Sequence, residues 1–199
     1  QTLAKLTLSP FAYNPTTNQL KIVTKLEVEI IFKNFDTDLH YKNKQKYYSS
    51  EFEHLYKKCI NYIPVESFSK DVITTYPVKY VIISDPMFQS ALQPFIDWKI
   101  KKGFQVVEGY TNDPLVGNTT SSIHAFIKNM YDNATANDPA PTYLLIVGDE
   151  AQVPSFNGNT GSHISDMYYC EFDGGGDFYP EMYFGRFSAI SAADVEVQV

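Results

Sequence analysis

A short apolar run at residues 143–147, Tyr-Leu-Leu-Ile-Val, is the feature that most constrains the fold of this chain. Pro141 precedes the run, and Gly148 and Asp149 follow it. A strand buried on both faces of a parallel sheet has this pattern, because helices cover both faces and neither needs polar side chains. The run therefore predicts a central strand that presents Asp149 at its carboxyl end, where ligands of open α/β sheets bind.

Strand and helix patterns alternate along the residues before this run. Residues 78–84 and 104–110 are typical of strands, whereas residues 86–102 and 120–131 place apolar side chains at helical spacing. The order strand, helix, strand, helix, strand predicts two successive βαβ units. We therefore expect an α/β fold with an open sheet and flanking helices.

An alternation of period two occupies the beginning of the chain. Residues 5–8 and residues 20–32 place apolar and polar side chains in turn, and a turn sequence at 14–18, Asn-Pro-Thr-Thr-Asn, lies between them. Half-buried antiparallel strands have this pattern. Because two strands alone are marginally stable, we expect these residues to be either the last part of a β-rich domain or an edge added to another structure.

The connection between the two patterns is polar. Residues 36–50 are rich in lysine, which favours an exposed linker. Residues 51–62 place apolar side chains at helical spacing, with Ser50 as the expected N-cap. We therefore divide the chain into residues 1–70, the end of a β-rich domain with its linker, and residues 71–199, the α/β domain.

Charge and hydropathy exclude some classes of partner. The chain has 16 basic and 23 acidic side chains and a net charge of −7. A protein that binds nucleic acid needs a basic face for the phosphates, so we expect no nucleic-acid partner. No apolar run approaches the ~18 residues that a membrane-spanning helix needs, and we expect no transmembrane segment. The chain begins at Gln1, which is compatible with a targeting segment that has been removed.

Neither the cysteines nor the glycines indicate a cofactor. Cys59 and Cys170 are too few for a disulfide framework and too far apart for a C-x-x-C site. We expect two separate small buried or half-buried residues, although the two could pair in an oxidising compartment. The glycines at 174–176 lack the G-x-G-x-x-G spacing and a following helix, and the chain has no P-loop sequence.

The glycine-rich loop carries oxygen donors at alternate positions: Asp173, Asp177, Tyr179 and Glu181. An EF-hand loop begins in a similar way, but Phe184 occupies the position of its bidentate acid. Together with Asp149, these oxygens would form a Ca²⁺ site. The alternative is a Gly/Asp loop that only joins two strands of a hairpin, residues 167–172 and 182–187.

His163, Ser165, Asp166 and Cys170 have the residue types of a nucleophile with its base. A catalytic triad is defined by geometry, which a sequence does not show. Because Ser and Asp in loops usually stabilise turns or cap helices, the sequence favours a structural role for these four residues.

Several segments together resemble the first half of the catalytic domain of gingipain-type cysteine peptidases. The matching sequences are F-I-D-W-K-I-K-K-G-F at 95–104, T-S-S-I-H-A-F-I-K at 120–128, Y-L-L-I-V-G-D at 143–149, I-S-D-M-Y-Y at 164–169 and D-F-Y-P-E-M-Y-F-G-R-F at 177–187. Residues 1–70 resemble the end of the β-rich prodomain that precedes that domain. The resemblance implies a caspase-like fold and a peptidase made as a zymogen, secreted or associated with the outer membrane at the cell surface.

The resemblance also implies a structural calcium ion. Carried over to this chain, its ligands are Asp149, Asp177, Glu181 and the backbone carbonyls of Tyr179 and Phe172. The glycine-rich loop is one residue longer here than in the family, which makes Asp173 an alternative to the carbonyl of Phe172. The implied partners are a protein or peptide substrate, the chain's own prodomain and the remainder of the catalytic domain.

The catalytic residues of the family have no counterpart within residues 1–199. Its histidine, in a Gly-His sequence, and its nucleophilic cysteine are expected after Val199, and neither Cys59 nor Cys170 matches the nucleophile. We therefore expect no catalytic residue in this chain, and we expect the chain alone to be inactive. Processing of the zymogen is expected near Lys70, the last basic residue before the α/β domain.

Two other functions are compatible with the sequence. A calcium-stabilised α/β binding or surface-assembly module would keep the fold without the chemistry. A flavodoxin-like or receiver-like domain would bind flavin or phosphate, but the first strand-to-helix turn, at residues 84–86, lacks the donors for these ligands.

Overall fold

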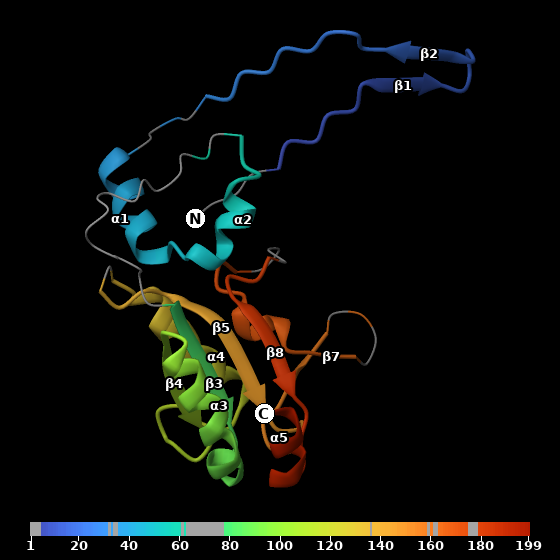
Figure 1. Ribbon diagram of the computed structural model, residues 1–199. Helices are drawn as coiled ribbons and strands as arrows, with labels where there is room; N and C mark the ends of the chain where they lie inside the picture. Colours follow the sequence, from blue (N-terminus) through green and yellow to red (C-terminus); the bar gives the residue numbers. More distant parts are fainter. Residues whose placement is uncertain are drawn as a thin grey trace. The chain divides into compact units, whose positions relative to one another are not determined.

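A computed structural model of the chain describes residues 5–31, 33, 36–60, 62, 78–135, 137–158, 160, 163–174 and 179–199. The chain forms two compact units, Gln1–Lys44 and Gln45–Val199 (Figure 1). The sequence suggested a domain boundary at residue 70. The division between the compact units lies earlier, after Lys44, because the residues that follow pack with the α/β part.

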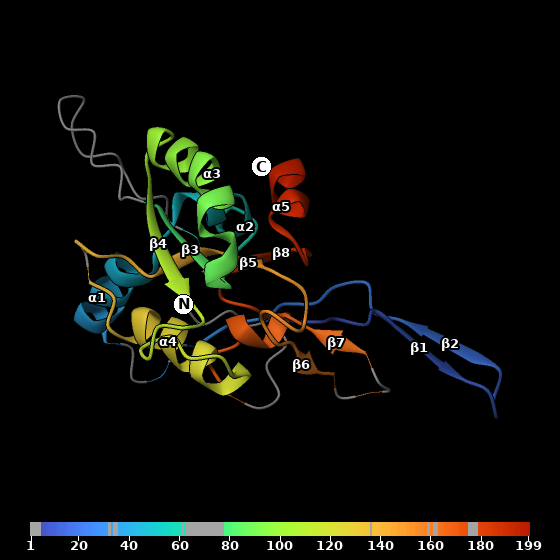
Figure 2. The same cartoon turned by 90° about the horizontal axis from the view of Figure 1, so that it is seen from below.

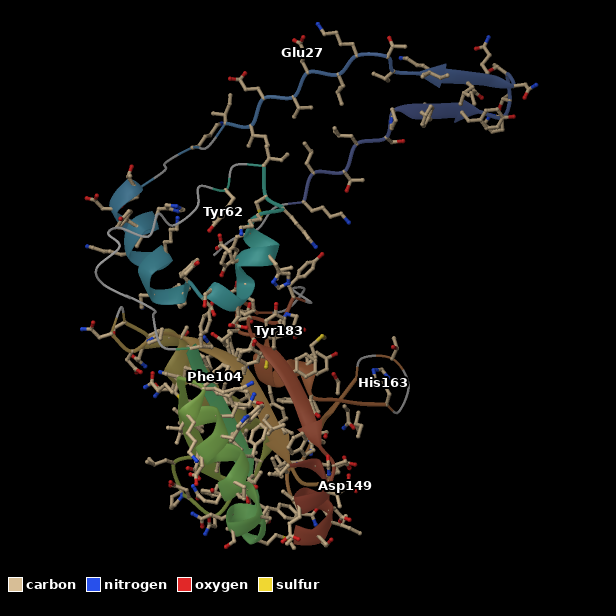
Figure 3. The ribbon with its side chains drawn as sticks, in the orientation of Figure 1. Glu27, Tyr62, Phe104, Asp149, His163 and Tyr183 are labelled. Carbon is tan, nitrogen blue, oxygen red and sulfur yellow. The ribbon has the colours of Figure 1, made fainter. Side chains whose placement is uncertain are left out.

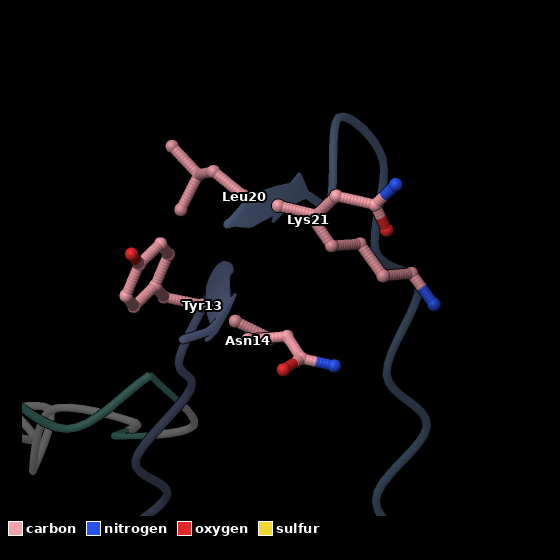
Figure 4. Close-up of a pocket in the computed structure, with 6 residues that line it drawn as sticks. Tyr13, Asn14, Leu20 and Lys21 are labelled. Atoms are coloured by element: carbon pink, nitrogen blue, oxygen red, sulfur yellow. The ribbon is translucent and has the colours of Figure 1, made fainter. Parts of the chain in front are cut away.

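The first unit contains one antiparallel hairpin, formed by β1 (Phe11–Asn14) and β2 (Gln19–Ile22). Tyr13 pairs with Leu20 across the two strands, and their side chains lie on the same side of the ribbon (Figure 4). The side chain of Asn14 accepts a hydrogen bond from the backbone N–H of Thr16 at 3.0 Å, which stabilises the turn. Both strands are exposed along their whole length.

The strands predicted at residues 5–8 and 20–32 are therefore correct only in part. The paired residues stop at Ile22, and neither residues 5–10 nor residues 23–31 form a strand. Period-two alternation indicates an extended segment with one apolar face. A strand also needs a neighbouring strand for its backbone hydrogen bonds, and the alternation does not show whether one is present.

Helix α1 (Thr37–Tyr47) replaces the linker predicted at residues 36–50. Asp36 caps it, because its carboxylate accepts a hydrogen bond from the backbone N–H of Leu39 at 2.9 Å. Short η1 (Ser50–Phe52) and α2 (Glu53–Tyr56) follow, and they end before the helix predicted to residue 62. The N-cap of η1 is Ser49 and not Ser50.

Four parallel strands form the sheet of the second unit: β3 (Val78–Ser84), β4 (Phe104–Tyr110), β5 (Pro141–Val147) and β8 (Tyr183–Phe187). Their spatial order is β4-β3-β5-β8. This confirms the α/β fold with a parallel sheet. The chain first moves outward from β3 to β4 and then returns across β3 to β5, so the strand order reverses between β3 and β5.

Helix α3 (Gln89–Lys101) and helix α4 (Thr120–Asp132) cover opposite faces of this sheet (Figure 2). Right-handed crossovers require this arrangement when the strand order reverses. The core beneath α3 contains Ile82, Leu92, Ile96, Leu145 and Val147. The core beneath α4 contains Val81, Ile83, Ile123, Ile127 and Ile146. The side chains of residues 143–147 thus alternate between two cores, which explains their continuous apolar pattern.

Capping residues define where the helices begin and end. Asp85 caps η2 (Pro86–Phe88), because its carboxylate accepts a hydrogen bond from the backbone N–H of Met87 at 2.8 Å. Thr119 and Ser122 form a capping box at the start of α4. Gly103 ends α3 with a φ of 92°, a left-handed conformation that favours glycine.

The region between β5 and β8 contains a two-stranded ladder, β6 (Phe156–Asn157) with β7 (Ile164–Ser165), followed by η3 (Met167–Cys170). The strand predicted at residues 167–172 is wrong, because a helical turn buries Tyr169 and Cys170 in succession. The strand predicted at 182–187 is confirmed as β8, and α5 (Ala192–Gln198) follows it. No helix in the described residues is long and apolar enough to span a membrane.

Candidate functional site

Asp149 lies directly beyond the carboxyl end of β5, as the sequence predicted. Gly148 precedes it with a φ of 127°, a conformation that favours glycine. The backbone N–H of Asp149 donates to the carbonyl of Ala189 at 2.9 Å, and its carboxylate accepts from the backbone N–H of Glu150 at 2.9 Å. Asp149 therefore organises the turn after β5 and connects it to the residues that follow β8.

Glu181 and Phe172 lie together at the two ends of the glycine-rich loop. A carboxylate oxygen of Glu181 accepts a hydrogen bond from the backbone N–H of Phe172 at 3.0 Å. The backbone N–H of Glu181 donates to the carbonyl of Cys170 at 2.9 Å. Tyr179 is exposed, and Asp177 lies outside the described residues. Two of the five residues expected to bind calcium are thus joined by a hydrogen bond, which uses the N–H of Phe172 and not the carbonyl that was expected to bind the ion.

Asp149 does not belong to the same group as Glu181. Strands β5 and β8 are parallel, with Tyr143 opposite Tyr183 and Val147 opposite Phe187. Glu181 precedes this paired region and Asp149 follows it, and the paired residues alone span about 13 Å. Asp149 and Tyr183 accordingly lie at opposite ends of the sheet (Figure 3). A calcium ion binds oxygen at about 2.4 Å and cannot join these ends.

The direction of β8 separates these residues. Because β8 runs parallel to β5, the residues that precede β8 lie at the amino-terminal edge of the sheet. The ligand set expected from the resemblance therefore divides between two edges.

Negative charge gathers around Glu181. Burial, followed by the nearby charge of Glu181, raises the pKa of the Tyr131 phenol well above its ordinary value, and Asp173 adds to the shift. The ring of Tyr131 also contacts the ring of Phe172, with centroids 4.8 Å apart. Among the described residues, no three His, Cys, Asp or Glu side chains gather as metal ligands.

Cys170 has the chemistry of a structural residue. Its side chain is buried, and burial raises the pKa of the thiol well above its ordinary value, with further contributions from Glu181 and Asp166. A thiol that stays protonated is a poor nucleophile. Asp166 is engaged with Arg186 and not with a histidine, since both Nε and Nη2 of the guanidinium face its carboxylate. The nucleophile-and-base interpretation of this segment is therefore not supported.

A polar hollow lies at the carboxyl edge of the sheet, next to the reversal of strand order between β3 and β5. Its volume is about 360 Å³. The side chains that line it are mostly carboxylates and amides: Asp85, Asn112, Asn118, Glu150 and Gln152. In open α/β sheets this position binds ligands, so the hollow is a candidate wall of a substrate cleft.

The chain is similar to cysteine peptidases. A family model described as peptidase family C25 matches residues 73–199. Lys-gingipain of Porphyromonas gingivalis is 33% identical over 199 residues, which are 97% of this chain and 11% of that protein. This chain thus spans about a tenth of the length of that relative.

Solved structures are similar in fold as well as in sequence. One that is described as "Structure of Protease" superposes with a TM-score of 0.56 and 37% identity, over 60% of this chain and 26% of the other. A complex of the pro- and mature domains of RgpB from Porphyromonas gingivalis gives a TM-score of 0.52 and 28% identity, over 60% of this chain and 27% of the other.

Proposed function

Because this chain belongs to peptidase family C25, we propose that its protein is a gingipain-like cysteine endopeptidase that hydrolyses protein or peptide substrates. The observation that carries the proposal is the extent of the family match. It begins at residue 73 and includes all four strands of the parallel sheet together with α3, α4 and α5.

The catalytic cysteine and histidine belong, in this proposal, to a part of the protein outside residues 1–199. The histidine would take the proton of the cysteine thiol, and the thiolate would attack the peptide carbonyl. The C–N bond would break, the amine would leave with a proton from the histidine, and water would hydrolyse the thioester to release the acid and the thiol. Two observations support this assignment: Cys170 is buried with a raised pKa, and Asp166 is bound to Arg186. Residues 78–199 would contribute the sheet and the polar hollow at its carboxyl edge.

The protein is further proposed to be a secreted or surface-associated zymogen, with residues 1–70 as the end of its prodomain. The similarity to the complex of RgpB pro- and mature domains supports a prodomain as partner. Processing near Lys70 remains part of the proposal, and Lys70 lies outside the described residues. N-terminal sequencing of the mature protein tests it, since a start far from residue 71 contradicts it.

A calcium ion is proposed at the amino-terminal edge of the sheet. The carboxylates of Asp177 and Glu181 and the carbonyls of Phe172 and Tyr179 would hold it, without Asp149. These are the hard oxygen donors that Ca²⁺ prefers, and the hydrogen bond from the Phe172 N–H to the Glu181 carboxylate brings the backbone at Phe172 next to one of them. The ion would stabilise the glycine-rich loop and take no part in the reaction.

A cysteine-directed peptidyl probe tests the activity. We expect the full-length protein to be labelled at one cysteine, and residues 1–199 prepared separately to remain unlabelled. Absence of labelling in a folded full-length protein would instead favour the non-enzymatic binding or surface-assembly module. Labelling at Cys170 would contradict the proposal, because that thiol is buried.

A further inference from the structure

The turn after β5, residues 148–155, forms one wall of the polar hollow. The residues of this turn that line the hollow are Glu150, Ala151, Gln152 and Pro154. Loops at the carboxyl edge of a parallel sheet carry ligand-binding groups, but they are usually more mobile than the strands that they follow. A wall that binds a ligand therefore needs contacts that hold it to the sheet.

Arg186 supplies such contacts from the neighbouring strand. It lies opposite Ile146 in the pairing of β5 with β8. Its Nη1 group donates to the carbonyls of Gly148 and Val153, both at 2.9 Å, and its Nη2 group donates to the hydroxyl of Ser155 at 3.0 Å. Both carbonyls belong to buried residues. One guanidinium group thus holds both ends of the turn.

Asp166 fixes the orientation of this guanidinium group. Its two carboxylate oxygens accept hydrogen bonds from Nε of Arg186 at 2.8 Å and from Nη2 at 2.7 Å. The Ser155 hydroxyl donates to the same carboxylate at 3.2 Å. Together with the bonds to the turn, these contacts use every N–H donor of the arginine, whose planar fork a lysine ammonium cannot reproduce.

The turn also has internal hydrogen bonds, and these fix the side chain of Gln152. The backbone N–H groups of Gln152 and Val153 donate to the carbonyl of Asp149, at 3.0 and 2.9 Å. The side-chain oxygen of Gln152 accepts from the Asp149 N–H at 3.1 Å. Gly148 leaves room for this side chain, since a Cβ at position 148 would lie 2.7 Å from the Gln152 Cβ. Because the amide oxygen of Gln152 is used, its NH2 group is the part that can bind a ligand in the hollow.

Gln152 and Glu150 together match the polar groups of a peptide main chain. The NH2 group of Gln152 can donate to a carbonyl, and the carboxylate of Glu150, an exposed residue of the same wall, can accept from an N–H. An extended peptide presents both kinds of group, and each needs a partner when it leaves water. The wall is therefore suited to the main chain of a bound peptide.

We propose that Arg186 is a positioning residue for the peptidase: it holds the turn so that Gln152 and Glu150 bind the main chain of the peptide substrate. The inference rests on the proposed function, which supplies that substrate. Arg186 itself touches neither the substrate nor the reacting groups. Its effect is on substrate binding, because a wall displaced by ~1 Å loses hydrogen bonds that require distances of about 3 Å.

Kinetics of the full-length protein test the proposal. Arg186→Lys keeps a positive charge beside Asp166 but cannot hold both ends of the turn. We expect its KM for peptide substrates to rise about tenfold with little change in kcat, since binding that the substrate and the transition state share affects KM alone. Rates are expressed per active site, titrated with the cysteine-directed peptidyl probe. A merely structural role of Arg186 would lower the number of labelled sites and leave the KM of those sites unchanged.

Gln152→Glu separates the contact with the ligand from the order of the turn. The carboxylate still accepts from the Asp149 N–H but cannot donate, so we expect a similar rise in KM. The double variant with Arg186→Lys should have a KM no higher than the larger of the two single effects, because both substitutions remove the same contact. Gln89→Glu adds the same charge at an exposed position of α3 outside the hollow, and this control should leave KM unchanged.

Hydrogen exchange gives a measurement that does not depend on activity. In Arg186→Lys, we expect the backbone N–H groups of Gln152 and Val153 to exchange faster than in the wild type, while those of β3 exchange at the same rate. An unchanged KM in Arg186→Lys, additive effects in the double variant, or unchanged exchange in the turn would each overturn the proposal.

Failure of the proposed function has a different signature. A folded wild-type protein that neither cleaves peptides nor reacts with the probe overturns the proposed function, and the role in substrate binding with it. The exchange rates in the turn would still show whether Arg186 fixes this wall of the hollow. The two failures are therefore distinguishable.

Discussion

Arg186 on β8 and Asp166 form a two-point ion pair, with Nε and Nη2 of the arginine 2.8 and 2.7 Å from the two carboxylate oxygens. The side chains are only 13% and 15% exposed. The Nη1 group of the guanidinium donates to the carbonyls of Gly148 and Val153, both at 2.9 Å. This single arginine thus connects β8, the turn after β5 and the residues before η3.

Replacement of this arginine is expected to destabilise the fold strongly. Arg186→Met leaves the Asp166 carboxylate buried without its charged partner, and we expect a loss of about 3–5 kcal/mol in the free energy of unfolding. Urea denaturation measures it. Lys128→Met is the control, because the Lys128–Asp132 pair is exposed and should contribute at most about 1 kcal/mol. Equal losses for the two variants would contradict the role assigned to Arg186.

Acid is expected to weaken a contact between β3 and the loop before β5. A hydrogen bond from the buried Lys79 ammonium, 2.8 Å away, holds the pKa of the Asp138 carboxyl below its ordinary value. The folded pKa is thus lower than the unfolded one, so the contribution is fully present above the unfolded pKa of about 3.9. It is lost as the pH falls through the folded pKa.

The comparison that checks this contribution is between wild type and Asp138→Asn. We expect the free energy of unfolding of the wild type to fall more steeply between pH 5 and pH 3 than that of the variant. The difference should be modest, because the Asp138 side chain is 57% exposed to solvent. Identical pH profiles would show that the pair contributes nothing to stability.

Chelation tests both the calcium proposal and its corrected ligand set. If Ca²⁺ binds only the folded protein, a concentration 100 times its dissociation constant stabilises by about 2.7 kcal/mol, and chelation lowers the Tm accordingly. We expect Glu181→Gln to remove this response in the full-length protein. Asp149→Asn should retain it, because Asp149 lies at the other edge of the sheet. Loss of the response in Asp149→Asn alone would restore the original ligand set.

The two thiols should differ in reactivity. Burial raises the pKa of the Cys170 thiol, whereas Cys59 is partly exposed. We expect iodoacetamide to modify Cys59 in the folded protein and to modify Cys170 only after unfolding, since the thiolate is the reactive form. Mass spectrometry of peptides from native and denatured samples measures both. Equal modification of the two cysteines in the native sample is the contrary result.

The sequence was sufficient for the part of the fold in which local patterns are strongest. The apolar pattern of each element predicted strands β3, β4 and β5 and the two helices between them. Residues at the helix ends, such as Asp85 and Gly103, added to the prediction of the first helix. Membership of the family was visible in the same segments. The direction of β8 was not visible, because a strand pattern is the same for parallel and antiparallel pairing.

The candidate site depends on the same point, and its calcium ligands stay a prediction. Phe172 and Glu181 lie next to each other in the structure, whereas the direction of β8 places Asp149 at the other edge of the sheet. The contacts of residues 45–62 were also missed. Residues 36–50 were interpreted as a linker because they are polar and rich in lysine, and residues 51–62 as a helix. Only the folded chain brings Ser49 and Glu51 to the start of β5.

Strand β8 is an outer strand of the sheet, with β5 as its neighbour among the described residues. Its other side presents backbone N–H and C=O groups that a further strand can pair with, and Phe184 on this strand is 41% exposed. A sample of residues 1–199 alone should therefore self-associate at high concentration through this edge. Phe184→Lys is the substitution that would keep such a sample dispersed, because charge on an edge strand opposes pairing between molecules.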